Sequence, residues 1–287
     1  MKNFLVIAFI FFMGSLIGWI IELFYRRFIS GANPERKWIN PGFLVGPYSP
    51  LYGFGLVAMY ILSQIDVSFI ENNTAKQIVL FLLMSIVMTL IEYIAGIIFI
   101  KGMKVKLWDY TNKWGNIQGI ICPQFSFYWA VLSAIYYFLI HPHISNSIYW
   151  LSEHLTFSFV IGFFYGIFLI DVCYSMQILV KVKKFAIDHD IIVKYQELKR
   201  SIRLSKEEYK ESKSFIFAFK SERSLSEHLK RYLELQSAFL SDSLEELEEK
   251  VSSKIDEANS KLEEKTKPIQ NKIEETQQKV KDLKKNR

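Results

Sequence analysis

The chain has 287 residues, of which 51% are hydrophobic, but its charge is divided unevenly. Residues 1–180 contain 10 Lys or Arg and 8 Asp or Glu, whereas residues 181–287 contain 25 Lys or Arg and 21 Asp or Glu. This profile is typical of a membrane domain followed by a soluble one. The net charge of +6 is spread over both parts and forms no compact basic patch with interleaved aromatic residues, which argues against nucleic acid as a partner.

Five apolar segments are candidates for transmembrane helices, because about 20 mostly apolar residues are needed to cross a bilayer. They cover residues 4–25, 51–65, 78–100, 119–140 and 155–180. The first is longer than the apolar core of a secretory signal and has no clear cleavage site, so we interpret it as an uncleaved span. We predict an all-α integral membrane protein whose partner is the lipid bilayer, with a transmembrane domain over residues 1–180 and a helical tail over residues 181–287.

The connections between these segments alternate in charge. Lys and Arg are in excess over residues 26–50 and 101–118, but not over residues 66–77 and 141–154, and three lysines open the tail within residues 181–184. Loops rich in Lys and Arg stay on the cytoplasmic side of a membrane. We therefore predict a multi-pass protein of the cell membrane, with its N-terminus outside and its tail in the cytoplasm.

Three carboxylates, Glu22, Glu92 and Asp171, lie inside the predicted spans, each in the half nearer the cytoplasm. An acid at this depth is costly, so it indicates a functional site by default. Glu22 stands four residues before Arg26, and the alternative for it is an intrahelical ion pair. For Glu92 and Asp171 the alternative is a hydrogen bond between helices.

The segment over residues 38–55 is apolar and aromatic, yet it contains three prolines and four glycines. It cannot form a regular helix before Pro50. Irregular backbone is tolerated at membrane depth only where it is buried in protein or lines a wet cavity. The segment is either a re-entrant loop that offers backbone groups to a ligand or a cytoplasmic loop stiffened by proline. Its candidate site residues, with one from the preceding span, are Trp19, Asn40, Gly42, Gly46, Pro47, Pro50 and Tyr52.

A second loop occupies the equivalent place after the third span. Trp108 follows Glu92 by sixteen residues, as Trp38 follows Glu22, which suggests two repeated two-helix units. The candidate site residues of this loop are Trp108, Asp109, Tyr110 and Asn116. The alternatives are that Asp109 pairs with a nearby lysine and that the aromatic residues are interface anchors.

Motifs for catalysis are missing from the sequence. It contains no G-x-x-x-x-G-K-[ST] phosphate loop, no G-x-S-x-G and no H-E-x-x-H. Cys122 and Cys173 are the only cysteines, and no Cys/His spacing is typical of zinc. We predict no enzyme activity, no catalytic residue, no metal and no cofactor.

Several of these segments carry a family resemblance. Residues 15–22 (SLIGWIIE), residues 40–55 (NPGFLVGPYSPLYGFG), and the blocks that begin at Glu92, Trp108 and Asn116 resemble the CmpB-like ABC-transporter type IV family over about residues 12–129. The chain departs from the family pattern at Gly14, Pro41 and Ala130, where tyrosine, arginine and glycine are usual. The resemblance implies a permease subunit that works with a separate ATPase subunit.

The tail has a regular apolar pattern. From Leu240 to Ile273 apolar residues recur in steps of four, three and four, a period of eleven that is typical of a straight or slightly right-handed coiled coil. We predict a coiled coil over about residues 225–285, kinked or divided at Pro268, that pairs with another copy or with a partner helix. The alternative is a single solvated helix held by i,i+4 charge pairs.

Two functions follow from these patterns. The first is a membrane subunit of a transport system, with its site in the cytoplasmic half of the helix bundle and a cationic or proton-coupled substrate. The second is a membrane scaffold or regulator that does not transport and that recruits partners, or copies of itself, through the coiled coil.

Overall fold

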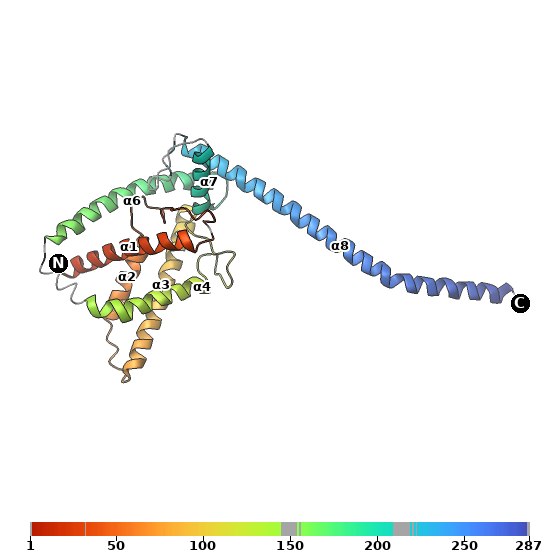
Figure 1. Ribbon diagram of the computed structural model, residues 1–287, viewed down its shortest axis with the longest axis horizontal. Coiled ribbons are helices and arrows are strands. Elements are labelled where there is room, and N and C mark those ends of the chain that lie inside the picture. Colours follow the sequence, from red (N-terminus) through yellow and green to blue (C-terminus); the bar gives the residue numbers. More distant parts are fainter. Residues whose placement is uncertain are drawn as a thin grey trace. The chain divides into compact units, whose positions relative to one another are not determined.

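The computed structural model describes residues 2–31, 33–144, 154, 156–208, 219, 221 and 223–285. Its elements are α1 (Lys2–Phe28), α2 (Pro50–Ser63), α3 (Asn73–Met103), β1 (Val105–Lys106), α4 (Pro123–Ile135), the π-helical turn η1 (Tyr136–Ile140), α6 (Phe157–Asp188), β2 (Val193–Lys194), α7 (Tyr195–Glu208) and α8 (Leu225–Lys285) (Figure 1). Packing divides the chain into two compact units, residues 1–229 and residues 230–287.

Four helices are long and apolar enough to cross a membrane, and they fit a multi-pass membrane protein. They cover Phe4–Phe28, Asn73–Met103, Pro123–Ile144 and Phe157–Asp188. The helix α2 is apolar but has only 14 residues, which at 1.5 Å per residue is about 21 Å. That is shorter than the hydrocarbon core of about 30 Å. Four of the predicted segments are thus confirmed as helices long and apolar enough to span a membrane, and a fifth span through α2 stays a prediction.

Two helix boundaries differ from the boundaries of the predicted spans. The fourth span was expected from residue 119, but Gly119 has a positive φ of 68° and the helix begins only at Pro123, a residue suited to the first helical turn. The fifth was expected to end at residue 180, but α6 continues to Asp188. Lysine is a good helix former, so the change from apolar to charged residues did not end the helix.

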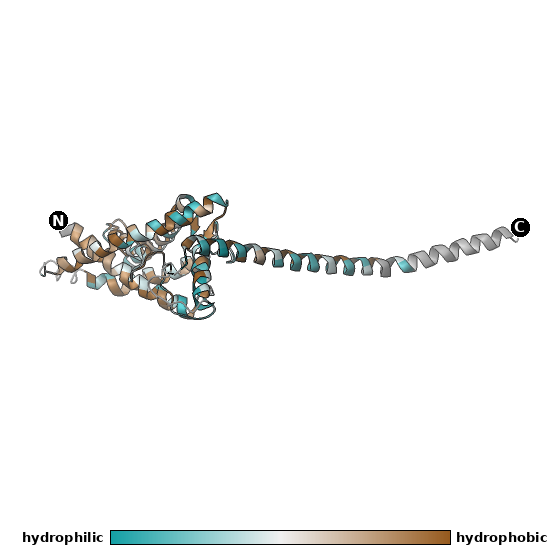
Figure 2. Cartoon of the chain, turned by 90° about the horizontal axis from the view of Figure 1, so that it is seen from above, coloured by the Kyte–Doolittle hydropathy of each residue, from teal (hydrophilic) through white to brown (hydrophobic). Residues whose placement is uncertain are grey.

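The outer surface of the helices is apolar. Large side chains such as Phe4, Ile86 and Ile170 are exposed on α1, α3 and α6. Figure 2 shows the apolar colouring over the helices of residues 1–229 and the mainly hydrophilic colouring of the first part of α8. An exposed apolar surface of this extent is typical of helices that face lipid.

The helices α1 and α2 pack closely because small residues lie between them. A Cβ atom added to Gly18 would lie 2.1 Å from Cβ of Tyr52, and one added to Gly14 would lie 2.8 Å from Cβ of Leu56. On the α2 side, Gly53 packs against Ser15 in the same way. Small residues four apart let helix backbones approach closely in membranes.

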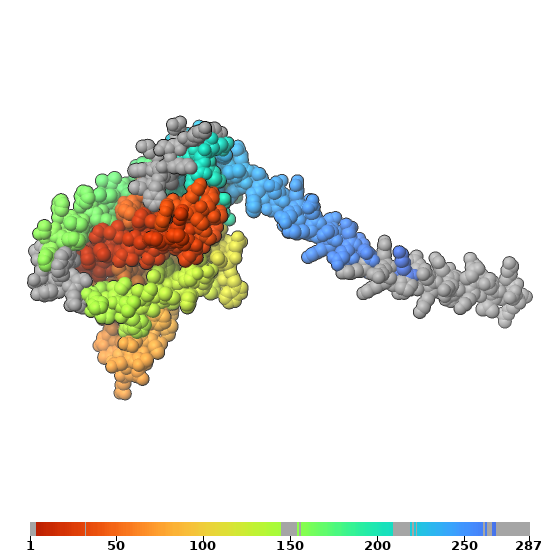
Figure 3. All heavy atoms as spheres, in the orientation of Figure 1, coloured from red at the N-terminus to blue at the C-terminus, as the bar shows by residue number. Residues whose placement is uncertain are grey.

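The remaining helices pack through larger side chains. Met59, Met84, Met88, Trp129 and Tyr136 form a buried cluster between α2, α3, α4 and η1. The α6 helix packs on α1 through aromatic rings, and the hydroxyl of Tyr165 donates to the carbonyl of Ala8 at 3.0 Å. Figure 3 shows α1 in red beside α4 in green on one face of the unit.

The α7 helix folds back onto the bundle. A short parallel pairing joins β1 to β2, with Val105 opposite Val193, and Gln196 of α7 donates to the carbonyl of Leu107 at 2.9 Å. Lys199 donates to the carbonyl of Gly42 at 2.6 Å. The two basic loops and α7 therefore lie at one end of the bundle, where α6 also ends (Figure 1).

The last part of the tail, Leu225–Lys285, forms one continuous helix, α8. Of the kink or division expected at Pro268, the division is wrong, because α8 runs on through this residue, and the kink stays a prediction. A helix can accommodate proline by a local bend and the loss of one hydrogen bond. The apolar side chains of the predicted stripe are exposed along α8, and they include Leu240, Leu244, Leu247, Val251, Ile255 and Leu262. The coiled coil stays a prediction.

The close approach of α1 and α2 predicts a position-specific effect of added volume. We expect Gly18→Ala to destabilise the fold by about 1–3 kcal/mol, because the new methyl group overlaps Tyr52 and the helices must separate. Gly166→Ala is the matched control, since no atom lies within 4 Å of its added Cβ. Thermal unfolding in detergent measures both, and equal stability of the two variants would contradict the packing described.

Candidate functional site

The loop before α2 enters the helix bundle. The amide of Ser49 donates to the carbonyl of Ser15, in the middle of α1, at 2.9 Å. The amide of Val45 donates to Asp171, in the middle of α6, at 3.0 Å. Leu44 and Tyr48 are buried between these helices. The loop is thus irregular backbone enclosed by protein, as required for such backbone at membrane depth.

Asp171 holds this loop in place. Its carboxylate accepts hydrogen bonds from the Gly46 amide at 2.7 Å, the Tyr48 hydroxyl at 2.6 Å and the Ser175 hydroxyl at 2.8 Å, in addition to the Val45 amide. All four donors are neutral groups. Hydrogen bonds to a charged acceptor are strong, and together they compensate the cost of burying the carboxylate.

Asn40 closes the start of the same loop. Its amide nitrogen donates to the carbonyls of Leu44 at 3.2 Å and Val45 at 2.7 Å. Its side-chain oxygen accepts from the indole of Trp19 on α1 at 2.7 Å. Trp19 and Asn40 therefore fix the loop to α1, as Asp171 fixes it to α6.

Glu92 is held differently. Its side chain is buried, with 2% of the residue exposed, and its two oxygens accept from the Tyr110 hydroxyl at 3.0 Å and the Trp129 indole at 2.9 Å. The ring of Tyr110 stacks on Phe125 with centroids 4.1 Å apart. In the described part of the chain, no Lys, Arg or His forms an ion pair with Glu92.

A cavity of about 970 Å³ adjoins this carboxylate, and we call it the Glu92 cavity. Its walls come from α1, α2, α3, the start of α4 and both loops. Of the predicted site residues, those that line it are Glu22, Gly42, Pro50, Tyr52, Glu92, Trp108, Asp109 and Tyr110. The predicted residues outside its lining are Trp19, Asn40, Gly46, Pro47, Asn116 and Asp171.

Glu22 lies on the wall of the Glu92 cavity, and Arg26 pairs with it. The guanidinium contacts Oε1 of Glu22 through Nη2 at 2.6 Å and Nε at 3.1 Å. The intrahelical ion pair expected from the spacing of these residues is confirmed. The charge of Glu22 is therefore balanced within its own helix.

The loop before α4 is ordered by its own polar side chains. Asn116 bonds to the carbonyls of Thr111 and Lys113, and Trp108 donates to the carbonyl of Ile120 at 2.8 Å. Asp109 pairs with Lys106 at 3.1 Å, which confirms the expected lysine partner.

Asp109 also reaches the strand before α7. Lys194 on β2 lies 3.2 Å from its second oxygen. Burial raises the pKa of Asp109, but hydrogen bonds from Thr111 and Lys106 outweigh this and lower the pKa to about 2. Asp109 is therefore ionised at neutral pH and holds β2 against the loop.

Several residues of the cavity carried no signal in the sequence. Trp129 stands 37 residues from Glu92 on another helix, and Tyr25 and Phe125 read as ordinary apolar residues of spans. Only their position in the folded bundle brings them to one wall. Within the described residues, no group of three or more His, Cys, Asp or Glu is placed to hold a metal ion.

The family model described as "Putative ABC-transporter type IV" (ABC_trans_CmpB) matches residues 9–176, more than half of the chain. The chain belongs to this family. The match contains most of α1, all of α2, α3 and α4, and Asp171, whereas α7 and α8 lie beyond it. No curated protein and no solved structure matches the chain.

The Glu92 cavity predicts that water reaches α3 one turn from Glu92. Ala95 lines the cavity, so we expect Ala95→Cys, with Cys122 and Cys173 replaced by alanine, to react with a water-soluble maleimide in permeabilised membranes. Ile86→Cys is the control, because Ile86 lies on the outer apolar surface of the same helix. Equal labelling of the two cysteines would contradict an aqueous cavity.

Proposed function

We propose that this chain is the membrane subunit of a transport system, a permease that works with a separate ATPase subunit, and that the Glu92 cavity is its substrate site. The family supports a membrane transport component. The observation that carries the site is the buried carboxylate of Glu92, which adjoins a large cavity and whose hydrogen-bond partners among the described residues are neutral donors. A charge held this way at membrane depth is a functional-site feature.

The lining of the Glu92 cavity favours an organic cation as substrate. Besides Glu22 and Glu92, the wall contains many aromatic side chains, including Tyr25, Phe43, Tyr52, Trp108, Phe125 and Trp129. Aromatic faces attract cations, and the carboxylate of Glu92 supplies the opposite charge. A volume of about 970 Å³ is at the upper end of the range for small-molecule sites. A proton-coupled mechanism would use the same carboxylate.

The basic loops support a cytoplasmic opening. Arg26 and Arg27 end α1, and Lys101 and Lys104 lie at the end of α3. These ends lie on the side of the bundle where α7 folds back, and positive residues favour the cytoplasm. A cytoplasmic ATPase would dock at this end, on the surface formed by both loops and α7.

Asp171 has a positioning role in this proposal. Four donors occupy its oxygens, three of them from the loop before α2. It sets the place of that loop, whose residues Gly42 and Pro50 form part of the cavity wall. The substrate would contact Glu92, and Asp171 would act through the loop.

The transport proposal predicts the effect of removing one charge. We expect Glu92→Gln to reduce the flux of at least one cation by about tenfold or more, since loss of a charged contact costs roughly 1.5–3 kcal/mol. The measurement is the flux of labelled tetraphenylphosphonium, choline and rubidium in inside-out vesicles from cells that express the full chain. Glu71→Gln is the control, because Glu71 is exposed in the loop between α2 and α3.

A second candidate, a membrane scaffold or regulator, is favoured by the exposed apolar stripe along α8. The same assay separates the two. The transport proposal is wrong if the flux of each cation is equal in the wild-type and Glu92→Gln proteins. The scaffold is supported if, in addition, the function of the protein in cells is lost when residues 230–287 are removed. Loss of flux in Glu92→Gln, with flux retained after removal of residues 230–287, supports transport.

A further inference from the structure

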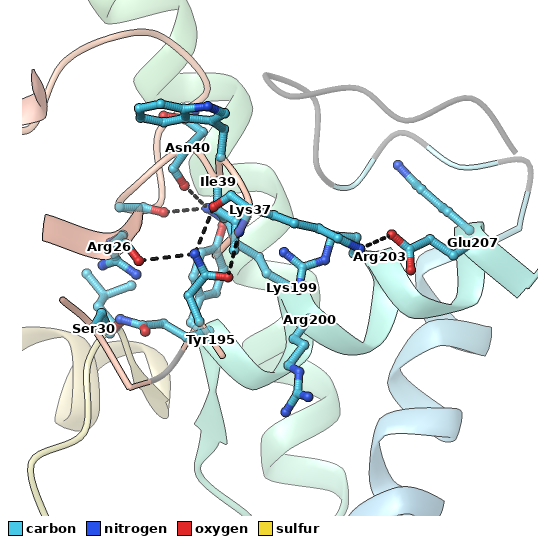
Figure 4. Close-up of a pocket in the computed structure, with 16 residues that line it drawn as sticks. Arg26, Ser30, Lys37, Ile39, Asn40, Tyr195, Lys199, Arg200, Arg203 and Glu207 are labelled. Atoms are coloured by element: carbon cyan, nitrogen blue, oxygen red, sulfur yellow. Dashed lines mark hydrogen bonds and ion pairs between the residues drawn. The ribbon is translucent and has the colours of Figure 1, made fainter. Parts of the chain in front are cut away.

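A second, smaller pocket lies between the end of α1, the loop over residues 33–42 and α7. Its volume is about 310 Å³, and we call it the α7 pocket. Figure 4 shows Lys199 and Arg203 on the face of α7 toward the loop that carries Lys37 and Asn40. It is distinct from the Glu92 cavity, although Arg26, Gly42 and a few other residues border both.

Basic side chains dominate the lining of the α7 pocket. They are Arg26, Lys37, Lys199, Arg200, Arg203 and Lys206, whereas Glu207 is the acidic residue of the lining. Lys37 lies 2.6 Å from Glu207 and 3.0 Å from Glu35. Glu35 is shared further with Arg203 at 3.2 Å and Arg200 at 3.7 Å. Two carboxylates, Glu35 and Glu207, are thus shared by three cations, and the lining holds more basic than acidic side chains, so the pocket keeps positive charge.

Two donors beside this pocket have hydrogens without an acceptor among the described residues. Lys199 donates to the carbonyls of Asn40 at 3.2 Å and Gly42 at 2.6 Å, and within the described residues it contacts no carboxylate. A protonated amine has three hydrogens, so one remains. Nε of Arg203 is buried and hydrogen-bonds to no described residue. Burial and the nearby Arg26 lower the pKa of Lys199 to about 7, a shift that a bound anion would oppose.

The surroundings of the pocket indicate its depth in the membrane. Trp38 lines the pocket, is 46% exposed, and packs edge-on against Phe24 and Phe28 of the last α1 turns. The guanidinium of Arg27 lies 5.1 Å from the centre of its ring. Exposed tryptophan beside arginine at the end of a span is typical of the headgroup region. We infer from these neighbours that the pocket opens at the level of the lipid phosphates.

We propose that the α7 pocket binds a phosphate group, carried by the headgroup of an anionic phospholipid. Arginine and lysine are the side chains that recognise phosphate, and basic pockets beside membrane helices bind anionic headgroups. The phosphate accepts hydrogen bonds from Nε of Arg203 and from Lys199. It joins α7, which lies beyond the family match, to α1 and the loop before α2. This site is independent of the proposed transport function.

The test is ligand binding to the delipidated full chain in detergent. Native mass spectrometry compares phosphatidylglycerol with phosphatidylcholine, and calorimetry measures inorganic phosphate. Lys199→Gln removes the charge but keeps two amide hydrogens for the Asn40 and Gly42 carbonyls, and Lys199→Arg retains the charge. Arg203→Lys keeps a charge opposite Glu35 but lacks the Nε donor, which gives a second probe. Lys184→Gln, at an exposed position near the end of α6, is the matched control.

We expect the wild-type and Lys184→Gln proteins to prefer phosphatidylglycerol over phosphatidylcholine. The Lys199→Gln and Arg203→Lys proteins should bind phosphatidylglycerol about tenfold more weakly than the wild type, because each has lost one charged hydrogen bond. Lys199→Arg should retain most of the affinity. Inorganic phosphate bound by the wild type and lost in Lys199→Gln, without a lipid preference, would support the phosphate pocket and overturn the lipid source. The proposal would be overturned if the folded wild-type, Lys199→Gln and Arg203→Lys proteins all bound phosphatidylglycerol with the same affinity and also all bound inorganic phosphate with the same affinity.

Discussion

The buried carboxylate of Asp171 is the constraint on which the rest of the membrane unit depends. A charge in the middle of α6 must be compensated, and two backbone amides and the tyrosine hydroxyl of one loop supply most of the compensation. The loop is consequently drawn into the bundle, where its end also bonds to Ser15 of α1. Because α2 starts at that depth, it can be short, and its Gly53 can pack closely on Ser15 of α1.

This arrangement gives the three acids of the spans different tasks. Asp171 is saturated by loop donors, and Glu22 is neutralised by Arg26 one turn away. Within the part of the chain that the structure describes, Glu92 alone of the three has two neutral donors as its partners, one from the loop before α4 and one from α4 itself. Asp171 and Glu22, whose charges are compensated, therefore shape the wall of the cavity. In the proposed function, Glu92 is the acid that faces the substrate.

The features that depend on local sequence rules could be predicted from the sequence. The apolar lengths of the long helices, the ion pair of Glu22 with Arg26 and the irregular backbone over residues 38–49 follow from composition, i,i+4 spacing and proline. The partners of Asp171 could not be predicted, because backbone amides 126 and 125 residues away carry no side-chain signal. The role of α7 was missed for a related reason. Its charged residues are typical of a soluble tail, yet Lys199 and Gln196 fold back onto loop carbonyls of the membrane unit.

Hydrogen exchange of the loop amides tests the central claim, that Asp171 holds the loop inside the bundle. In the full chain in lipid nanodiscs, the amides of Val45 and Gly46 should be protected from exchange. In Asp171→Asn they should exchange about tenfold faster or more, since each bond to the charged acceptor is worth roughly 1.5–3 kcal/mol. Ser175→Ala, which removes one donor and keeps the carboxylate, should retain most of the protection. Unchanged exchange of Val45 and Gly46 in Asp171→Asn would contradict the account.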